Sequence, residues 1–504
     1  MTGGVPAEPL LFESSRHGRR ASTMPASGIS RSGARARLPA ALSSGRAPEL
    51  PELSERDIVR HYTRLAHRNF SIDEGFYPLG SCTMKYNPKI AEVVAALPGF
   101  ARLHPGQPPE QVQGLLELLC ALEDALCELA GMAAVTLQPA AGAAGELTGL
   151  TLIRAWHEAR GERRTRVLIP DAAHGTNPAS VRLAGYEVVE VPTDASGRID
   201  IEALGKTVDE RVAALMLTNP NTLGLFERNI TEIARLLHAS GAKLYYDGAN
   251  LNAIVGRARP GDMGFDVVHL NVHKTFATPH GGGGPGAGPV GVTSDLVRFL
   301  PGPRPARLPD GTYGWRDEPD SIGRVHGWHG NVGILVRAYS YLLSLGGAGL
   351  RRVSERAVLN ANYLLRQVAR DYELPYPAPV MHEFVVSARL LRRTSGVHAH
   401  DIAKSLIDRG FHPMTVYFPL IVDEAMMIEP TETESRETLD AFADALHELA
   451  VEAATAPEAL RQAPVSTPVR RPDEARAARH LVPRWRPTAN PPAANPPSAA
   501  EPTR

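Results

Sequence analysis

Apolar residues recur along the chain in two alternating patterns. From Val112 to Leu129 they follow the i, i+3, i+4 spacing of a helix that stops at Gly131, and similar spacing predicts helices over 146–160 and 230–238. Short apolar runs between such segments are typical of buried strands, which we expect at 133–137, 167–170, 187–191, 213–218, 243–246 and 267–270. Strands separated by helix-length segments predict βαβ units and a largely parallel sheet.

From about Gly333 the pattern changes to helix, a strand at 383–387, helix, and a second strand near 415–418. This order predicts a smaller C-terminal α/β domain, over 333–465, after a large domain over 111–332. Residues 51–110 are expected to border the functional site. Arg-rich residues 1–50, without an acidic side chain from Ser14 to Pro48, are typical of a poorly ordered arm, and 466–504 of an extended Pro/Arg-rich tail.

Charge and composition exclude several classes of protein. Lys and Arg total 54 against 55 Asp and Glu, so no global attraction to nucleic acid or to an acidic membrane is expected. No apolar run approaches the roughly 18 residues that a membrane span needs. Three cysteines cannot build a disulfide framework. We therefore expect a cytoplasmic protein with neither a nucleic-acid nor a membrane partner.

Ligands of an open parallel sheet bind at the carboxyl ends of its strands, and unusual residue groups fall there. A turn of small residues, 140–145, joins a strand to a helix and suits a phosphate. Asp247 follows one strand and Lys274 follows the next, while the glycine-rich run 281–288 has few backbone restrictions. Taken singly, these groups also have plain structural explanations: a tight turn, a capping aspartate and a flexible hinge.

Together the groups match the chemistry of pyridoxal phosphate. A strand-end lysine forms a Schiff base with an aldehyde, a carboxylate keeps a pyridine nitrogen protonated, and a helix N-terminus receives the phosphate. His174 follows another strand and is placed to lie flat on the pyridine ring, although an ordinary loop histidine has the same pattern.

Longer runs resemble the P-protein family of the glycine cleavage system, and within it subunit 2 of the two-subunit glycine dehydrogenase (decarboxylating). The resemblance extends from about Leu10 to about Trp485. The runs that carry it are LGSCTMKYNP (79–88), QPAAGAAGELTG (138–149), DAAHGTNPAS (171–180), LTNPNTLGL (217–225), YYDGANL (245–251), LNVHKTFATPHGGGGPGAGPVGV (270–292), FHPMTVYFPL (411–420) and MIEPTETES (427–435).

The resemblance implies the aspartate-aminotransferase-like α/β fold, fold type I of the pyridoxal phosphate enzymes, with a large mostly parallel domain and a smaller C-terminal one. It makes Lys274 the Schiff-base lysine, Asp247 the partner of the pyridine nitrogen and His174 the stacking residue. Further cofactor contacts are implied for Gly142, Ala143 and Ala144 at the phosphate, and less firmly for Thr222, Asn250 and His273 near the ring.

The implied reaction is decarboxylation of glycine with release of CO2 and transfer of the aminomethyl group to the lipoyl arm of the H-protein. This chain carries only the lysine half of the fused, single-chain form of the enzyme. A lysine-lacking subunit 1 is therefore an implied partner, with two copies of each subunit. The T-protein and L-protein complete the system.

Two positions depart from the family. Ala144 stands where a histidine or glutamine is common, which removes a hydrogen-bond donor near the phosphate. The run VHGWHGN (325–331) also differs from the aromatic-containing run that we expect there. His326 and His329 within it have no third ligand in view, and we assign no metal.

Two other functions remain open at this point. One is a different pyridoxal phosphate enzyme, an amino-acid decarboxylase or a sulfur-removing lyase, for which Cys82 is the cysteine outside an apolar helix. The other is a scaffold subunit without cofactor. Lys274 and Asp247 argue against the scaffold, because it has no need of a strand-end lysine and carboxylate.

Overall fold

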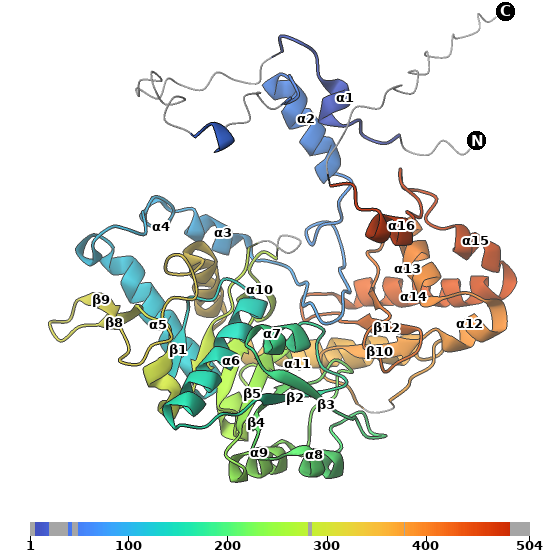
Figure 1. Ribbon diagram of the computed structural model, residues 1–504. Helices are drawn as coiled ribbons and strands as arrows, with labels where there is room; N and C mark the ends of the chain where they lie inside the picture. The colour runs from blue at the N-terminus through green and yellow to red at the C-terminus, as the bar shows by residue number, and fades with distance from the viewer. Residues whose placement is uncertain (1–5, 20–38, 43–48, 281–284, 377–378, 484–504) are drawn as a thin grey trace, which may run out of the picture.

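The structure is a computed structural model that describes residues 6–19, 39–42, 49–280, 285–376 and 379–483. Its large domain is built on a seven-stranded sheet with the order β1-β7-β6-β5-β4-β2-β3 (Figure 1). The strands are β1 Ala134–Thr136, β2 Arg166–Pro170, β3 Glu187–Val191, β4 Val212–Thr218, β5 Lys243–Gly248, β6 Val267–Leu270 and β7 Val290–Val292.

The five strands from β6 to β3 run parallel, as predicted, and β7 is antiparallel to both β6 and β1. The hydrophobic pattern did not predict β7, because its three residues, Val-Gly-Val, are too few for a periodicity to show. β7 separates β1, the edge strand, from the parallel strands.

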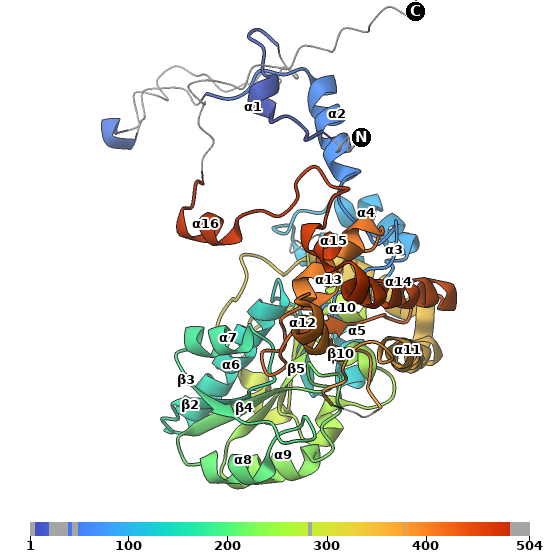
Figure 2. The same cartoon turned by 90° about the vertical axis from the view of Figure 1, so that its right-hand side faces the viewer.

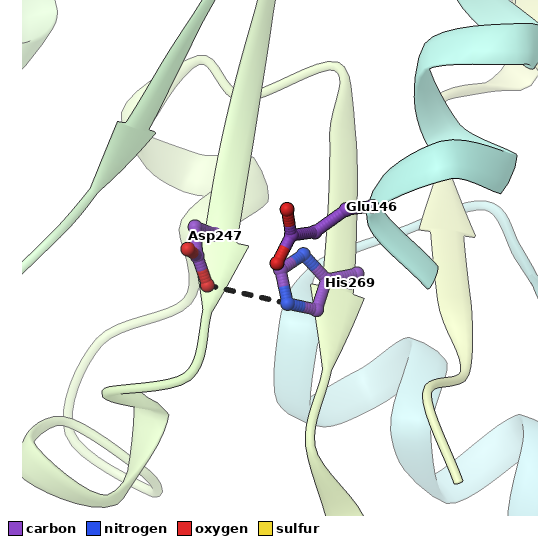
Figure 3. Close-up of side chains that lie close together, drawn as sticks. All are labelled: Glu146, Asp247 and His269. Atoms are coloured by element: carbon purple, nitrogen blue, oxygen red, sulfur yellow. Dashed lines mark ion pairs between the residues drawn. The ribbon is translucent and has the colours of Figure 1, made fainter. Parts of the chain in front are cut away.

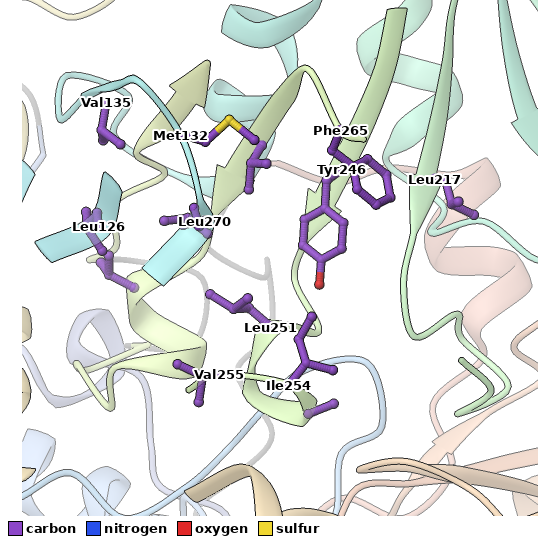
Figure 4. Packing of buried hydrophobic residues seen from close by; sticks show 14 of the residues in the cluster. Leu126, Met132, Val135, Leu217, Tyr246, Leu251, Ile254, Val255, Phe265 and Leu270 are labelled. Carbon is purple, nitrogen blue, oxygen red and sulfur yellow. The ribbon is translucent and has the colours of Figure 1, made fainter. Parts of the chain in front are cut away.

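Helices cover both faces of this sheet. Successive strand residues point to opposite faces, so Tyr245 belongs to the cluster under α6 and α7, whereas Tyr246 packs with Phe265 and Leu270 on the other face (Figure 4). The helices of the large domain are α5 Gln113–Ala130, α6 Gly142–Ala159, α7 Asn177–Leu183, α8 Ile201–Thr207, α9 Ile230–Ala239 and α10 Val272–Thr275.

Three boundaries of the large domain can be compared with the predicted ones. Helix α6 begins at Gly142 rather than at the expected Glu146, so the small-residue turn is itself the first helical turn. Helix α5 ends as predicted, with Gly131 in the left-handed region at its C-terminus. Strand β5 extends two residues beyond its predicted end and includes Asp247.

Helix α11, Val332–Val368, joins the two cores and is broken by left-handed Gly346. The small domain contains an antiparallel sheet of β10 Phe384–Ser387, β12 Ala425–Ile428 and β11 Thr415–Val416. β12 was not predicted, and β11 is shorter than expected. The helices of this part are α12 Arg389–Ser395, α13 Ala399–Asp408, α14 Arg436–Thr455, α15 Pro457–Gln462 and α16 Glu474–Arg479.

The N-terminal part stands away from both domains. Helices α1 Leu11–Ser14 and α2 Glu55–Ala66 lie apart from the body in both views (Figures 1 and 2). Glu8, which precedes α1, links this segment to α2, because its carboxylate accepts hydrogen bonds from Arg64 and contacts His61. The chain then returns through α3 Lys89–Ala95 and α4 Pro98–Ala101, while β8 Arg304–Arg307 and β9 Tyr313–Arg316 form a separate hairpin.

Parts of three predicted segments lie outside the described residues: much of the basic arm over 1–50, the end of the Pro/Arg-rich tail, and Gly281–Gly284 of the glycine-rich run. Among the helices of the described ranges, none combines the length and apolar character that crossing a bilayer requires.

Candidate active site

The lysine and the aspartate singled out above lie at the ends of neighbouring parallel strands. Asp247 is the penultimate residue of β5, and Lys274 lies in the short helix α10 directly after β6. Both side chains are buried, with 1% and 7% of their surface exposed. Nζ of Lys274 donates a hydrogen bond of 2.9 Å to the carbonyl of Ser81, from the segment before the large domain.

Asp247 is surrounded by groups that favour its ionised form. Its carboxylate accepts hydrogen bonds from Asn177 Nδ2 at 2.9 Å and from the Ala249 N–H at 3.0 Å, and Nε2 of His269 lies 3.2 Å away (Figure 3). Burial by itself raises the pKa of Asp247, but His269, His174 and these hydrogen bonds outweigh burial and leave the pKa below its usual value. The carboxylate is therefore ionised at neutral pH.

His269 links Asp247 to Tyr245 on the same face of the sheet. The Tyr245 hydroxyl donates to the Gly145 carbonyl at 3.1 Å, so its oxygen is left to accept from Nδ1 of His269, also at 3.1 Å. Nε2 of His269 lies 3.2 Å from Asp247 without forming a hydrogen bond to any described residue. Its effect on the site is electrostatic, because its proximity lowers the pKa of Asp247.

Glu146 completes this buried group. Its ligand atoms, with those of Asp247 and His269, lie within 4.8 Å of one another (Figure 3). One oxygen of Glu146 accepts from Thr176 Oγ1 at 2.6 Å and the other from Ser180 Oγ at 2.8 Å. A protonated pyridine nitrogen would find the acidic side chain of Asp247 beside it, with Glu146 close by, so the residues present fit pyridoxal phosphate.

The start of α6 fits the phosphate end of the same cofactor. Ala141 gives no side-chain cap to the first turn, so the N–H groups of Gly142, Ala143 and Ala144 are available to an anion. A Cβ on Gly142 would lie 2.1 Å from Oδ1 of Asn271, so any other residue there would displace the Asn271 side chain. Oδ1 of Asn271 is itself buried with no hydrogen-bond partner among the described residues.

His174 lies in the loop between β2 and α7. Its Nδ1 is 2.9 Å from Oγ1 of Thr176, and its ring meets Phe418 of the small domain edge-on, with 6.1 Å between ring centroids. Burial, and then the positive charge of Lys274, lowers the pKa of His174. The imidazole ring is therefore uncharged at neutral pH, as stacking on a cofactor requires.

The three less firmly implied residues differ in their surroundings. The Thr222 hydroxyl donates to the Ala172 carbonyl at 2.6 Å, and Nδ2 of Asn250 donates to Pro220 O and Glu383 Oε1 at 3.0 and 3.2 Å. Nδ1 of His273 is buried without a hydrogen-bond partner among the described residues, and burial lowers the pKa of His273 to about 3. Of the three residues, His273 has the polar atom most available to a ligand, because its Nδ1 has no partner among the described residues.

A large cleft opens beside these groups. It encloses about 900 Å³ and is lined by His273 and His280 from the large domain and by Tyr77 and Met84 from the preceding segment. The preceding segment, between residues 68 and 87, thus borders the cleft. The cleft has the size to admit a substrate and a flexible arm.

Two other features of the sequence have local structural roles. Sγ of Cys82 lies 3.4 Å from Nε2 of His280, and burial raises the pKa of the Cys82 thiol, which disfavours the thiolate that a sulfur-removing lyase needs. His329 stacks on Trp315 with ring centroids 3.9 Å apart.

Several residues of the site escaped sequence reasoning. Glu146, His269 and Ser81 face the lysine or aspartate, and Glu383 and Glu429 approach from the small domain. A polar residue within an apolar strand, as in Val-Val-His-Leu, was a usable signal for His269. No local signal existed for Glu383 and Glu429, because only the packing of the two domains brings them to Lys274.

Comparisons with known proteins agree with this geometry. The family model of the glycine cleavage system P-protein matches residues 32–304, and that of the glycine dehydrogenase C-terminal domain matches 353–467. A probable glycine dehydrogenase (decarboxylating) subunit 2 from Caldanaerobacter subterraneus subsp. tengcongensis is 56% identical over 94% of this chain and 98% of its own length. A protein of the same name from Bacillus licheniformis is 56% identical over 95% and 99%.

Solved structures share the fold. A glycine decarboxylase (P-protein) of the glycine cleavage system, in inhibitor-bound form, superposes with a TM-score of 0.69 at 23% identity over 82% of this chain and 94% of its own. The sphingosine-1-phosphate lyase of Burkholderia pseudomallei gives 0.59 at 15% identity, over 84% and 96%.

The parallel sheet, the strand-end lysine and aspartate and the small C-terminal domain define a fold-type I enzyme of the pyridoxal phosphate class, as the sequence predicted. The chain belongs to the P-protein family of the glycine cleavage system, within the subunit 2 group of glycine dehydrogenase (decarboxylating).

Proposed function

We propose that this chain decarboxylates glycine with pyridoxal phosphate held on Lys274, and passes the aminomethyl group to the lipoyl arm of an H-protein. The C–C bond of glycine breaks and CO2 leaves. The remaining carbon bonds to one sulfur of the lipoyl disulfide, and the other sulfur takes up the electron pair and a proton. When bound, pyridoxal phosphate supplies the sink for the electrons of the broken bond.

The observation that supports this proposal most strongly is the pairing of Lys274 with Asp247 at the ends of adjacent strands. Nζ of Lys274 is buried and held by a single carbonyl, that of Ser81, so it can be released to make a covalent link to the cofactor. Asp247 is fixed by Asn177, Ala249 and His269 and stays ionised. Its role is to keep the pyridine nitrogen protonated.

The other residues orient the cofactor and enclose it. His174 presents a neutral ring for stacking, and the first turn of α6 offers its N–H groups to the phosphate. Lys274, once free of the cofactor, is placed to hold or move a proton at the α-carbon of the substrate. Thr222, Asn250 and His273 stay proposals for contacts near the ring.

A partner subunit 1 and the H-protein are part of the proposal, as are the T-protein and L-protein of the system. The exposed helix α2 supports a partner near the N-terminus, because Val59 and Tyr62, which are 57% and 56% exposed, lie on a helix that stands away from the body (Figure 2). The cleft beside His273 supports an entry for a lipoyl arm.

Borohydride trapping tests the cofactor chemistry. The full chain is mixed with pyridoxal phosphate, with and without subunit 1, reduced, digested and mapped by mass spectrometry. The reduced cofactor is expected on Lys274 in the wild-type chain. It should be absent in Lys274→Ala and unchanged in the control Lys206→Ala, which removes an exposed lysine of α8.

Glycine turnover is then measured as exchange of labelled bicarbonate into the glycine carboxyl group, with subunit 1 and lipoylated H-protein present. Exchange that depends on both proteins is the expected result. Trapping on Lys274 without glycine exchange, but with turnover of another amino acid, would point to a different pyridoxal phosphate enzyme. No trapping under any condition would support the scaffold function instead.

A further inference from the structure

A pair of carboxylates outside the cofactor contacts lies buried between the small domain and the lysine. Glu383 directly precedes β10 and Glu429 directly follows β12, and the antiparallel register brings these two positions to the same end of the sheet. Both side chains are fully buried, as is His382, whose Nε2 lies 3.8 Å from Glu383 Oε1 and 4.0 Å from Glu429 Oε1. Buried carboxylates are costly, so their partners need to be accounted for.

The pair holds the segment that precedes the large domain. Oε2 of Glu383 accepts from the Ser81 N–H at 2.6 Å, and Oε1 of Glu429 pairs with Oγ1 of Thr83 at 2.5 Å. Leu79 forms a β-bridge with Ile428, so this segment pairs with the end of β12, the central strand of the small sheet. The carboxylates thus fasten residues 79–83 to the small domain.

Ser81 connects the pair to the lysine. It is a non-glycine residue in the left-handed region, at φ 64°, with its N–H on Glu383 and its carbonyl on Nζ of Lys274 at 2.9 Å. A left-handed serine is disfavoured unless its surroundings hold it there. Glu383 supplies one of the contacts that hold Ser81 in this conformation. Hydrogen bonds thus connect the Glu383 carboxylate to the backbone of Ser81, and the backbone of Ser81 to Lys274.

Burial raises the pKa of both carboxyls, that of Glu429 to about 7, and repulsion by Glu429 raises that of Glu383 further, so near neutral pH the pair carries one shared proton. Its location follows from the hydrogen-bond partners. Both oxygens of Glu383 accept from N–H groups, of Ser81 and Asn250, which can only donate. Glu429 meets a hydroxyl through Oε1, and its Oε2 has no partner among the described residues, so Glu429 has room for the proton.

Other titratable groups also act on Lys274. Burial lowers the pKa of His382 to about 3, and His174 and His280 are likewise shifted toward the neutral ring, so none of these rings supplies charge at neutral pH. The groups with which the lysine interacts electrostatically are Cys82, His174, His273, His280, His382, Glu383 and Glu429. Among these, Glu383 is the one left as an anion by its hydrogen bonds.

We propose that Glu383 is a positioning residue for Lys274: as the ionised member of the pair, it holds Ser81 with its carbonyl on the lysine and stabilises the lysine ammonium, so the small domain sets the charge state of Lys274. The proposal deepens the proposed function and rests on the role given there to Lys274. Glu429 holds the shared proton and fastens the segment through Thr83.

The test measures the reactivity of Lys274 without cofactor. The cofactor-free full chain is labelled with formaldehyde and cyanoborohydride between pH 6 and 10, and methylation of Lys274 is quantified by mass spectrometry. Glu383→Gln should lower the pKa of the lysine, move the midpoint of the labelling profile down by about one unit and raise the rate near neutral pH about tenfold. Glu429→Gln should shift the midpoint by less than half as much.

Two further variants separate charge from architecture. Glu458→Gln, at an exposed carboxylate of α15, should leave the profile unchanged. If Glu383→Gln does not fold, Asn250→Ala removes one of the two N–H donors, favours protonation of Glu383 and should raise the rate near neutral pH about threefold. Folding of each variant is checked by circular dichroism.

A folded Glu383→Gln or Asn250→Ala chain with the wild-type profile would overturn the proposal, and so would a larger shift from Glu429→Gln than from Glu383→Gln. Failure of the proposed function is detected by a separate experiment, borohydride trapping on wild-type Lys274, which uses neither variant. The methylation experiment uses no cofactor, so the two failures can be told apart.

Discussion

Nε2 of His269 lies 3.2 Å from Oδ1 of Asp247, and the two residues are register partners on the adjacent parallel strands β5 and β6. Side chains at paired positions of a sheet point to the same face, so the strand register itself brings the imidazole to the carboxylate. Tyr245, also in β5, holds the other ring nitrogen. The sheet thus supplies both the acid and the imidazole that lowers its pKa.

Replacing His269 with Gln should weaken cofactor binding. His269 lowers the pKa of Asp247, so without the imidazole that pKa rises and the site loses affinity for a pyridinium, by about tenfold per pKa unit. The acid limb of kcat/KM should move to higher pH. Spectrophotometric titration with pyridoxal phosphate and a pH–rate profile measure both effects. His238→Gln on α9 is the control, and an unaltered profile in His269→Gln would contradict the assignment.

Asp247→Ala should keep part of the cofactor binding but lose decarboxylation. The phosphate cradle and Lys274 remain, while the charge that keeps the pyridine nitrogen protonated is gone. Loss of one such electrostatic partner costs about a hundredfold or more in kcat. Borohydride trapping measures the retained cofactor, and glycine–bicarbonate exchange measures the lost step. Unchanged turnover, next to an unaffected Asp310→Ala control, would exclude the role given to Asp247.

Ala144→Gln should tighten pyridoxal phosphate binding. Ala144 lies in the first turn of α6, where a side-chain amide can add one donor to the N–H groups that face the phosphate. A hydrogen bond to a charged group contributes about 1.5–3 kcal/mol, so the dissociation constant should fall by about tenfold or more. Equilibrium titration of the cofactor-free chain is the measurement, with Ala159→Gln at the far end of α6 as control. Equal affinity in both variants would show that the donor is supplied elsewhere.

Stability should fall as the pH rises from about 5 to 8, in part through Glu429. Burial raises the pKa of Glu429 from 4.5 to about 7 in the folded chain. In this window the unfolded chain has lost the proton and the folded chain still holds it, so folding is favoured at low pH and that contribution is lost as the pH passes through about 7. Thermal unfolding monitored by circular dichroism should show a Tm that falls by a few degrees.

Glu429→Gln should flatten this dependence, because glutamine is neutral throughout the window. Glu458→Gln, at an exposed site, should keep the wild-type slope. A Glu429→Gln chain with the same slope as the wild type would mean that other groups carry the effect.

Much of the large domain was predictable from the sequence. β2, β4 and β6 are largely apolar runs because helices cover both faces of the sheet, and such runs are visible without any partner, whereas β3, Glu-Val-Val-Glu-Val, is a partly exposed edge strand. β7 and β12 were missed for opposite reasons. β7 is too short to show a pattern, and β12, Ala-Met-Met-Ile, has a composition that suits a helix equally well.

By itself the sequence determined which residues stand at the strand ends. The positions of Asp247 and Lys274 after apolar runs, and the small residues in the first turn of α6, are local features that a chain shows before it folds. Only the tertiary structure decided what surrounds them. His269 reaches Asp247 through strand register, and Glu383 reaches Lys274 through Ser81 across some 300 residues of sequence. Local sequence patterns indicate which residues are buried and whether a segment is a helix or a strand. The electrostatic environment of a buried charge depends instead on distances between segments, which only packing sets.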